Sequence, residues 1–327
     1  MIQRAWHPDL LVGFEQCLLP LDLVENSLGG DPAEDFSAVL VRPVQRPGTN
    51  RAVLYVHGWN DYFFQAHLAD FWAEQGYDFY ALDLRRYGRS WREGQLRGFT
   101  TDLREYFEEL DLAVAELRAD HDHLVLMGHS TGALTAALYA HGHPGEFDAL
   151  VLNSPWLDLQ GGPLARTLGP LIKSLGGQRP TTILPLPDSG FTRKTLHVNE
   201  GGEWDYDLAL KSGAVSPIRV GWLKAVFQGH ARVAAGLAIT CPVLVLCSSR
   251  SDFSRKWSEA MRAADVVLDV DQIATRAVRL GPIVTVARID GAVHDVVLST
   301  PDVRARVFAE ITRWLRAYAP VGASTRG

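Results

Sequence analysis

The chain has 327 residues, of which 47% are hydrophobic and 21% are charged, and its formal net charge at pH 7 is −6. This length gives room for one large domain or two ordinary ones with a full hydrophobic core. The acidic balance, without any cluster of lysine and arginine, excludes nucleic acid as the main partner.

The first residues contain no apolar segment of the kind that a secretory signal peptide needs. No run approaches the roughly 18 to 20 apolar residues that cross a bilayer. Three cysteines, Cys17, Cys241 and Cys247, form an odd set without metal-type spacing, so we expect reduced thiols. Together these features predict a cytoplasmic protein with no integral membrane segment. A monomer and a homodimer are both compatible with the sequence.

Strand and helix patterns alternate along most of the chain. The alternating segment 36–43 ends at a proline and is expected to be an edge strand, whereas the fully apolar run 52–56 is expected to be a central strand buried on both faces. Further strands are expected at residues 77–82, 124–127, 147–152, 242–246 and 283–288, and helices at residues 101–120, 133–141 and 303–318. This alternation predicts an α/β fold, with a mostly parallel central sheet flanked by helices.

The rhythm breaks between residues 156 and 237, which are rich in glycine, proline and aromatic residues and contain no predicted buried strand. The stretch is far longer than the loops found inside compact domains. We therefore predict an inserted module at 156–237, within a core formed by residues 1–155 and 238–327.

A nucleophile motif lies at Gly128-His-Ser-Thr-Gly132, directly after a predicted strand and directly before a predicted helix. In G-x-S-x-G elbows the serine has strained backbone angles and stands at the carboxyl edge of the sheet. The helix amino terminus behind it favours negative charge during acyl transfer. The alternative, a glycine-rich turn that binds a nucleotide, lacks a G-x-G-x-x-G pattern or a Walker-type lysine. Ser130 is thus the predicted nucleophile.

Three motifs give the chain a family resemblance: Tyr55-Val-His-Gly-Trp59, Leu82-Asp-Leu-Arg-Arg-Tyr-Gly-Arg-Ser90 and the Gly-His-Ser-Thr-Gly elbow. The chain resembles an α/β-hydrolase, and most of all the lysophospholipase and monoglyceride-lipase-like branch, which is also grouped with the serine aminopeptidases. The resemblance covers roughly residues 35–155 and 240–317. It implies an α/β-hydrolase fold that needs no cofactor, with the insertion 156–237 lying over the active site as a lid.

The resemblance also implies an oxyanion hole made of two backbone N–H groups. Thr131, which follows the nucleophile, would supply one, and Trp59, which follows His-Gly, would supply the other, with Asn60 as the alternative. In the Asp83–Ser90 motif, Arg86 replaces the first glycine of the family pattern. We expect Asp83 and Arg85 to brace the active-site loops without a catalytic role.

The catalytic base follows serine and acid in the chain order of this fold. Of the eleven histidines, His197, His230 and His294 lie far enough downstream of Ser130. His294 follows the last predicted strand and precedes the final helix, so it is the predicted base. His197 and His230 belong to the insertion and are expected to pack or to touch substrate. The other histidines, including His129, are expected to be loop or strand-end residues. The pairs His121/His123 and His141/His143 have no carboxylate or cysteine at ligand spacing, so no metal site is expected.

Two residues compete for the role of the acid. Asp252 is the first acid after the strand that ends at Leu246, and its position alone favours it. Asp265 lies at the family's usual spacing from His294, and the preceding segment then becomes a short insertion. We favour Asp265, and Asp252 stays open as the alternative.

The predicted function is a carboxylic ester hydrolase that forms an acyl-enzyme on Ser130. Expected substrates are small-molecule monoesters with an apolar part, such as monoacylglycerols, lysophospholipids or half-esters. One alternative is a peptidase or amidase with the same triad, for which a carboxylate cluster in the lid would hold a free amino group; the candidates are Glu200, Glu203, Asp205 and Asp207. A non-catalytic ligand-binding homologue is a further alternative.

Substrate-binding residues cannot be assigned from the sequence. Two apolar sets in the insertion are expected to serve mainly in packing, with part of their surface left for an acyl chain: Leu168, Leu171, Ile172 and Leu175, and then Trp222, Leu223, Val226 and Phe227. The aromatic and acidic segment Glu203–Tyr206 either faces the pocket or forms a packed loop.

Overall fold

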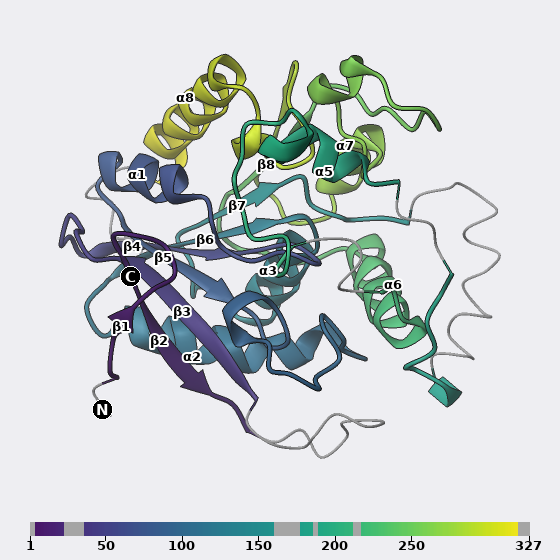
Figure 1. Cartoon of the computed structure of the whole chain (residues 1–327). Helices are drawn as coiled ribbons and strands as arrows, with labels where there is room; N and C mark the ends of the chain where they lie inside the picture. The colour runs from purple at the N-terminus through teal and green to yellow at the C-terminus, as the bar shows by residue number, and fades with distance from the viewer. Residues whose placement is uncertain (1–3, 23–35, 160–176, 186–188, 212–216, 320–327) are drawn as a thin grey trace. The chain divides into compact units, whose positions relative to one another are not determined.

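The computed structural model describes residues 4–22, 36–159, 177–185, 189–211 and 217–319 (Figure 1). The chain divides into two compact units. The first unit is Met1–Asp122, Gly161–Asp188 and Asp207–His230, and the second is His123–Gln160, Ser189–Tyr206 and Ala231–Gly327. The predicted insertion 156–237 is therefore divided between the two units, and its role as a lid stays a prediction.

The described part of the first unit contains five strands, and four of them pair antiparallel with a neighbour. Their order is β1 (His7–Pro8), β2 (Phe14–Pro20), β3 (Ser37–Pro43), β5 (Asp78–Asp83) and β4 (Arg51–Val56), and only β4 and β5 are parallel to each other. The prediction of an edge strand at 36–43 is wrong, because β3 pairs with β2 on one side and β5 on the other. The strand β2 escaped prediction because its buried residues are interrupted by exposed ones.

The helices of the first unit are α1 (Ala66–Glu74), α2 (Phe107–Arg118) and the beginning of α6 (Val220–Ala235). Short 3-10 turns lie at η1 (Gly88–Ser90) and η2 (Leu103–Tyr106). The predicted helix 101–120 is thus divided: Asp102 caps η2 by accepting the N–H of Arg104 at 2.9 Å, and α2 follows.

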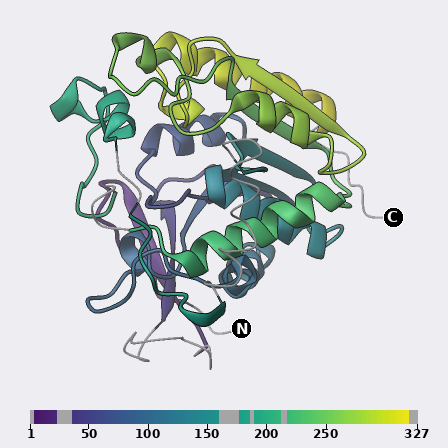
Figure 2. The same cartoon turned by 90° about the vertical axis from the view of Figure 1, so that its right-hand side faces the viewer.

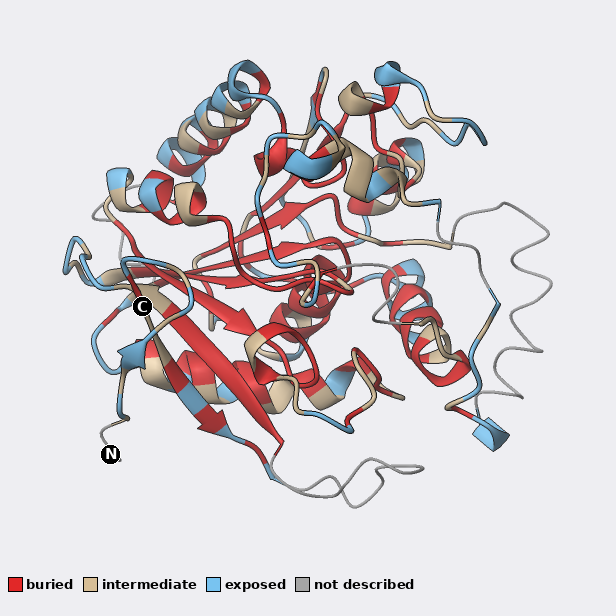
Figure 3. Ribbon diagram, viewed as in Figure 1, coloured by how far each residue is buried: buried red, intermediate tan, exposed pale blue. Residues whose placement is uncertain are grey.

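The second unit has a fully parallel sheet with the order β6 (His123–His129), β7 (Ala149–Asn153), β8 (Val243–Ser248) and β9 (Val284–Ile289). Its α-helices are α3 (Ser130–Gly142), α5 (Phe191–Leu196), α7 (Val270–Ala277) and α8 (Pro301–Tyr318), and its 3-10 turns are η3 (Val198–Glu200), η4 (Glu259–Ala263) and η5 (Val296–Leu298). The strands β7 and β8 are buried along their whole length and are red in Figure 3. β9 is partly exposed and lies beside α8 (Figure 2), where the indole N–H of Trp314 donates to Thr285 Oγ1 at 3.1 Å.

The parallel strands of the second unit all end at the same edge of their sheet. β6 ends directly before Ser130, and β7 ends at Asn153. The segments after β8 and β9 carry Asp265 and His294. In open α/β sheets ligands bind outside the carboxyl ends of the strands, so residues distant in sequence gather at this edge.

The three cysteines, Cys17, Cys241 and Cys247, are free and buried, as the prediction of reduced thiols requires. Burial raises the pKa of Cys241 and of Cys247 to about 12, so both thiols stay protonated at neutral pH. Within the described ranges, no helix is both long enough and apolar enough to span a membrane. A cytoplasmic location stays a prediction.

Candidate active site

Ser130 stands at the sharp turn between β6 and α3. Its φ is 54°, a left-handed value that non-glycine residues rarely adopt, and this is the strained backbone that the motif predicts. A Cβ at Gly128 would lie 2.7 Å from the backbone oxygen of Gly132, because strand and helix approach closely there. Gly128 therefore permits the turn that presents the serine hydroxyl.

His294 connects Ser130 to Asp265 through its two ring nitrogens. Its Nε2 lies 3.1 Å from Ser130 Oγ, and its Nδ1 lies 2.8 Å from Asp265 Oδ2. When Nδ1 carries the proton, it donates to the carboxylate and leaves Nε2 free to accept the serine proton. All three side chains are buried in the second unit, so the arrangement can transfer a proton in a site with little water.

Backbone groups hold the carboxylate of Asp265. Its Oδ1 accepts the N–H groups of Val267 and Leu268, both at 2.7 Å, which leaves Oδ2 for His294. Asp252 instead accepts the backbone N–H of Ser254 at 3.1 Å and faces Arg250 at 3.8 Å. Of the two acids that the sequence left open, the structure brings Asp265 to the histidine.

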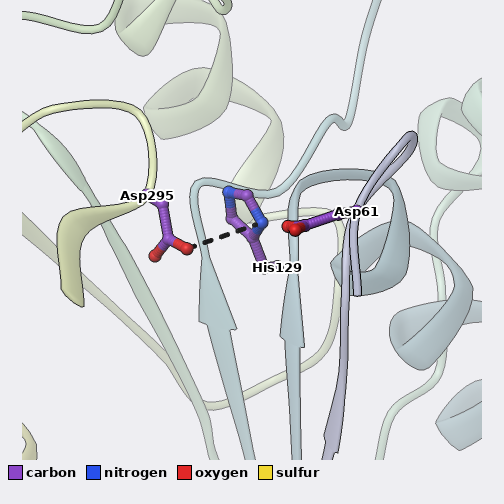
Figure 4. Close-up of side chains that lie close together, drawn as sticks. All are labelled: Asp61, His129 and Asp295. Atoms are coloured by element: carbon purple, nitrogen blue, oxygen red, sulfur yellow. Dashed lines mark ion pairs between the residues drawn. The ribbon is translucent and has the colours of Figure 1, made fainter. Parts of the chain in front are cut away.

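Three further polar residues lie around His294, and the sequence analysis assigned a role to none of them. The rings of His129 and His294 have their centroids 5.0 Å apart. His129 Nδ1 lies 3.9 Å from Asp295 Oδ2, and this ion-pair contact is the dashed line in Figure 4. Asn153 donates to Asp295 at 2.6 Å. His129 directly precedes Ser130 and Asp295 directly follows His294, so the sequence could have indicated that both lie near the site. No feature of the sequence indicated this for Asn153.

The two predicted oxyanion donors, Thr131 and Trp59, belong to different units. Thr131 lies in the first turn of α3, where backbone N–H groups have no partner inside the helix. Trp59 follows β4 in the first unit, and its ring centroid is 5.2 Å from that of Trp222 on α6. Asn60, the alternative donor, has a φ of 54°. The role of these backbone groups stays a prediction.

Asp83 braces the loop that follows β4, in line with the structural role expected for it. Its Oδ1 accepts the N–H of Phe63 at 2.9 Å, and its Oδ2 accepts from Arg89 Nη1 at 2.8 Å. Arg85 forms a buried ion pair with Glu109 at 2.6 Å. Both residues contribute to the shape of the first unit.

Arg86 stands where the family pattern has a glycine. Its backbone conformation explains why the pattern has glycine at this position. Its φ is 66°, in the left-handed region that glycine adopts without strain. The guanidinium offsets this strain by donating to the carbonyl of Phe99 at 2.7 Å and by lying 4.5 Å from the ring centre of Phe36.

Several side chains in the described part of the insertion are packed against neighbouring groups. Trp204 donates its indole N–H to the carbonyl of Leu298 at 2.6 Å, and Arg304 lies 4.9 Å from its ring centre. His197 accepts the N–H of Asn199 and packs edge-on against Tyr206, a packing role. Trp222, Val226 and Phe227 are buried, whereas the predicted apolar residues Leu168, Leu171, Ile172 and Leu175 lie outside the described residues.

Comparison with known proteins places these features in a family context. Residues 48–297 match the model of the family described as "Serine aminopeptidase, S33". A curated monoacylglycerol lipase from Mycolicibacterium smegmatis is 32% identical over 143 residues, which cover 40% of this chain and 50% of that protein. The chain thus matches about half the length of this curated relative.

Solved structures share the fold at low sequence identity. The monoacylglycerol lipase of Paleococcus ferrophilus has a TM-score of 0.62 and 21% identity, covering 81% of this chain and 94% of that one. A soluble variant of monoglyceride lipase from Saccharomyces cerevisiae, in complex with a substrate analogue, also has a TM-score of 0.62, with 18% identity and coverage of 92% and 96%. These likenesses establish the α/β-hydrolase fold that the motifs predict.

Proposed function

The chain belongs to the serine aminopeptidase S33 family, and on that premise we propose that it is a carboxylic ester hydrolase with Ser130 as its nucleophile. The observation that carries the proposal is the continuous contact from Ser130 through His294 to Asp265. Nucleophile, base and orienting acid within hydrogen-bond reach are the arrangement that activates a serine hydroxyl.

In the acylation step, Ser130 Oγ attacks the ester carbonyl while His294 Nε2 takes the hydroxyl proton. Asp265 stabilises the imidazolium that forms and keeps the ring in the tautomer with its proton on Nδ1. The backbone N–H groups of Thr131 and Trp59 donate to the developing oxyanion. The tetrahedral intermediate then expels the alcohol, which receives the proton from His294.

In the deacylation step, water attacks the acyl-enzyme and gives a proton to His294. The second tetrahedral intermediate collapses, the carboxylic acid leaves, and the proton returns to Ser130 Oγ. All steps use groups of this chain and water, so the proposed reaction needs no cofactor or metal.

The proposed substrates are monoesters with an apolar acyl or alcohol part. The monoacylglycerol lipases among the similar proteins favour this class. In the proposal, the region 156–237 covers the site as a lid. The aromatic pair of Trp59 and Trp222 supplies apolar surface next to one of the proposed oxyanion donors.

A peptidase or amidase reaction is the second candidate, because the matched family is described as a serine aminopeptidase family. That reaction needs a free carboxylate to hold the substrate's amino group. Glu200 is already paired with Arg193, and Asp207 accepts the N–H of Ala209 at 2.7 Å. Glu203, Asp205 and Asp207 are exposed. Comparing aminoacyl-amide turnover with ester turnover decides between the candidates.

The test is a series of p-nitrophenyl esters from acetate to palmitate, measured with the wild-type protein and with Ser130→Ala as the blank. We expect a rate that depends on Ser130 and peaks at one chain length. If no ester gives a serine-dependent rate but aminoacyl amides do, the peptidase candidate replaces the esterase.

A further inference from the structure

The loop that carries His294 is fixed to the sheet on both sides of the histidine. Before it, Ser248 Oγ on β8 donates to the carbonyl of Ala292 at 2.7 Å. After it, Asn153 at the end of β7 contacts two consecutive residues, Asp295 and Val296. The second attachment uses a side chain that is neither part of the triad nor needed by the chemistry of ester hydrolysis.

Both ends of the Asn153 amide are used in this attachment. Its Nδ2 donates to Asp295 Oδ1 at 2.6 Å, and its Oδ1 accepts the backbone N–H of Val296 at 3.1 Å. Asn153 is fully buried, and the exposed fraction of Asp295 is only 2%. Burying an amide and a carboxylate is unfavourable unless both are hydrogen-bonded. In the apolar strand β7, packing alone would therefore favour an apolar side chain over an asparagine.

The place of Asn153 in the sheet links the two ends of the catalytic group. It is the register partner of His129, the residue directly before Ser130, on the neighbouring strand β6. On the other side it holds the two residues that directly follow His294. Asn153 therefore connects the strand that leads to Ser130 with the loop that carries His294.

We propose that Asn153, together with Asp295, is a positioning residue that sets the distance and orientation of His294 relative to Ser130. This inference rests on the proposed function for its effect on turnover. Asn153 does not touch the reacting atoms. Its contribution lies in keeping the base at 3.1 Å from the nucleophile before substrate arrives.

The test exchanges the hydrogen-bonding partners. In Asn153→Asp the residue can still accept from Val296, but it cannot donate to Asp295, and two carboxylates face each other. In the double variant Asn153→Asp/Asp295→Asn, a donor and an acceptor again face each other with the same net charge. If the two residues only fill space, the single and the double variant should lose activity to the same extent. If the hydrogen bond between them matters, the double variant should recover activity.

We expect Asn153→Asp to lower kcat on a p-nitrophenyl ester by about 10- to 100-fold, with KM changed by less than about twofold. The double variant should recover most of the lost kcat. Wild-type kcat in Asn153→Asp, or a double variant as impaired as the single one, would overturn the proposal. Asp148→Ala is the matched control: it removes a 2.8 Å bond to the N–H of Leu124 at the opposite end of β7 and should leave kcat unchanged.

A second measurement separates this inference from the proposed function. We expect the proton on Nδ1 of His294, bonded to Asp265, to give a downfield proton NMR signal, which its absence in His294→Ala would identify. We expect this signal to shift or broaden in Asn153→Asp and to return in the double variant. If the wild-type protein hydrolyses no ester, the proposed function fails, and this signal alone decides the positioning role: an unchanged signal in Asn153→Asp overturns it.

Discussion

Asp265 and Asp252 both follow β8, but their carboxylates have different partners. Asp265 is fully buried and bonded to His294, whereas Asp252 accepts a bond from Ser254 in its own turn. We predict that Asp265→Asn lowers kcat by about 10³- to 10⁴-fold, because the imidazole loses its correct tautomer and its partner charge. Asp252→Asn should stay within about twofold of the wild type.

Steady-state kinetics of the two variants on one ester checks this prediction, with circular dichroism to verify that each is folded. A large loss in Asp252→Asn, together with near-normal turnover in Asp265→Asn, would contradict the assignment of the acid.

His57 makes the stability of the protein depend on pH. Burial lowers its pKa below the ordinary value of 6.5. Its Nδ1 donates to the carbonyl of Gly58 at 2.7 Å, which the ring can do in either protonation state. Its Nε2 accepts the N–H of Leu84 at 3.1 Å, and this bond needs the neutral ring. As pH falls below 6.5, the unfolded chain binds a proton that the folded protein does not. Stability is therefore fully present above this pH and decreases as the pH falls toward the folded-state pKa.

The measurement is the free energy of unfolding by urea between about pH 7.5 and about pH 5.5. We predict that it falls more steeply with decreasing pH in the wild type than in His57→Gln, whose side chain does not titrate. Equal slopes for the two proteins would show that His57 is not the source of the dependence.

At the scale of the elements, the turn between β6 and α3 depends on the absence of a side chain at Gly128. A Cβ there would lie 2.7 Å from both Gly132 O and Ala133 Cα, and these are backbone atoms that cannot move aside. We predict that Gly128→Ala lowers the free energy of unfolding by about 2 to 3 kcal/mol or more. The control is Gly177→Ala, where a Cβ meets nothing within 4 Å and the change should stay within about 0.5 kcal/mol.

Chemical denaturation of both variants provides the comparison. Equal stability of Gly128→Ala and Gly177→Ala would mean that the elbow can relax around a methyl group.

The strands that the sequence predicts correctly are those with continuous apolar runs. The runs 52–56 and 242–246 became β4 and β8, because burial on both faces requires apolar residues at every position. The exposed positions of β2 break this signal, so the partner of β3 remained unseen and β3 was taken for an edge strand. Pairing between strands is a property of the tertiary structure that a local pattern does not contain.

The sequence predicts a residue of the candidate site when its neighbours along the chain form a recognisable pattern. Ser130 lies in a five-residue pattern, and His294 has a fixed place between the last strand and the last helix. Asp265 needed the family spacing, because two acids follow β8. Asn153 has no sequence signal, since its role depends on contacts with residues that lie 142 and 143 positions away.

At the scale of the whole molecule, substrate choice rests on the proposal that the region 156–237 covers the site. Trp222 on α6 is buried and packs against Trp59, whose backbone is a proposed oxyanion donor. If the Trp59 ring borders the acyl group, removing its support enlarges that space. We predict that Trp222→Ala shifts the preferred p-nitrophenyl ester toward longer acyl chains.

Phe227→Ala is the matched control, because Phe227 is buried on the same helix and stacks on His230 rather than on Trp59. Its chain-length profile should keep the wild-type optimum. The same shift in both variants would indicate general loosening of α6, and no shift in Trp222→Ala would remove Trp59 from the acyl pocket.

The central claim is that Ser130 is a nucleophile activated by His294 and Asp265. Its most direct test is labelling with a fluorophosphonate, followed by mass spectrometry of the peptide that contains Ser130. We predict one covalent adduct on Ser130 in the wild-type protein, none in Ser130→Ala, and greatly slowed labelling in His294→Ala. Failure of the folded wild-type protein to react, or an adduct on a different residue, would contradict the claim and favour a ligand-binding protein or a different nucleophile.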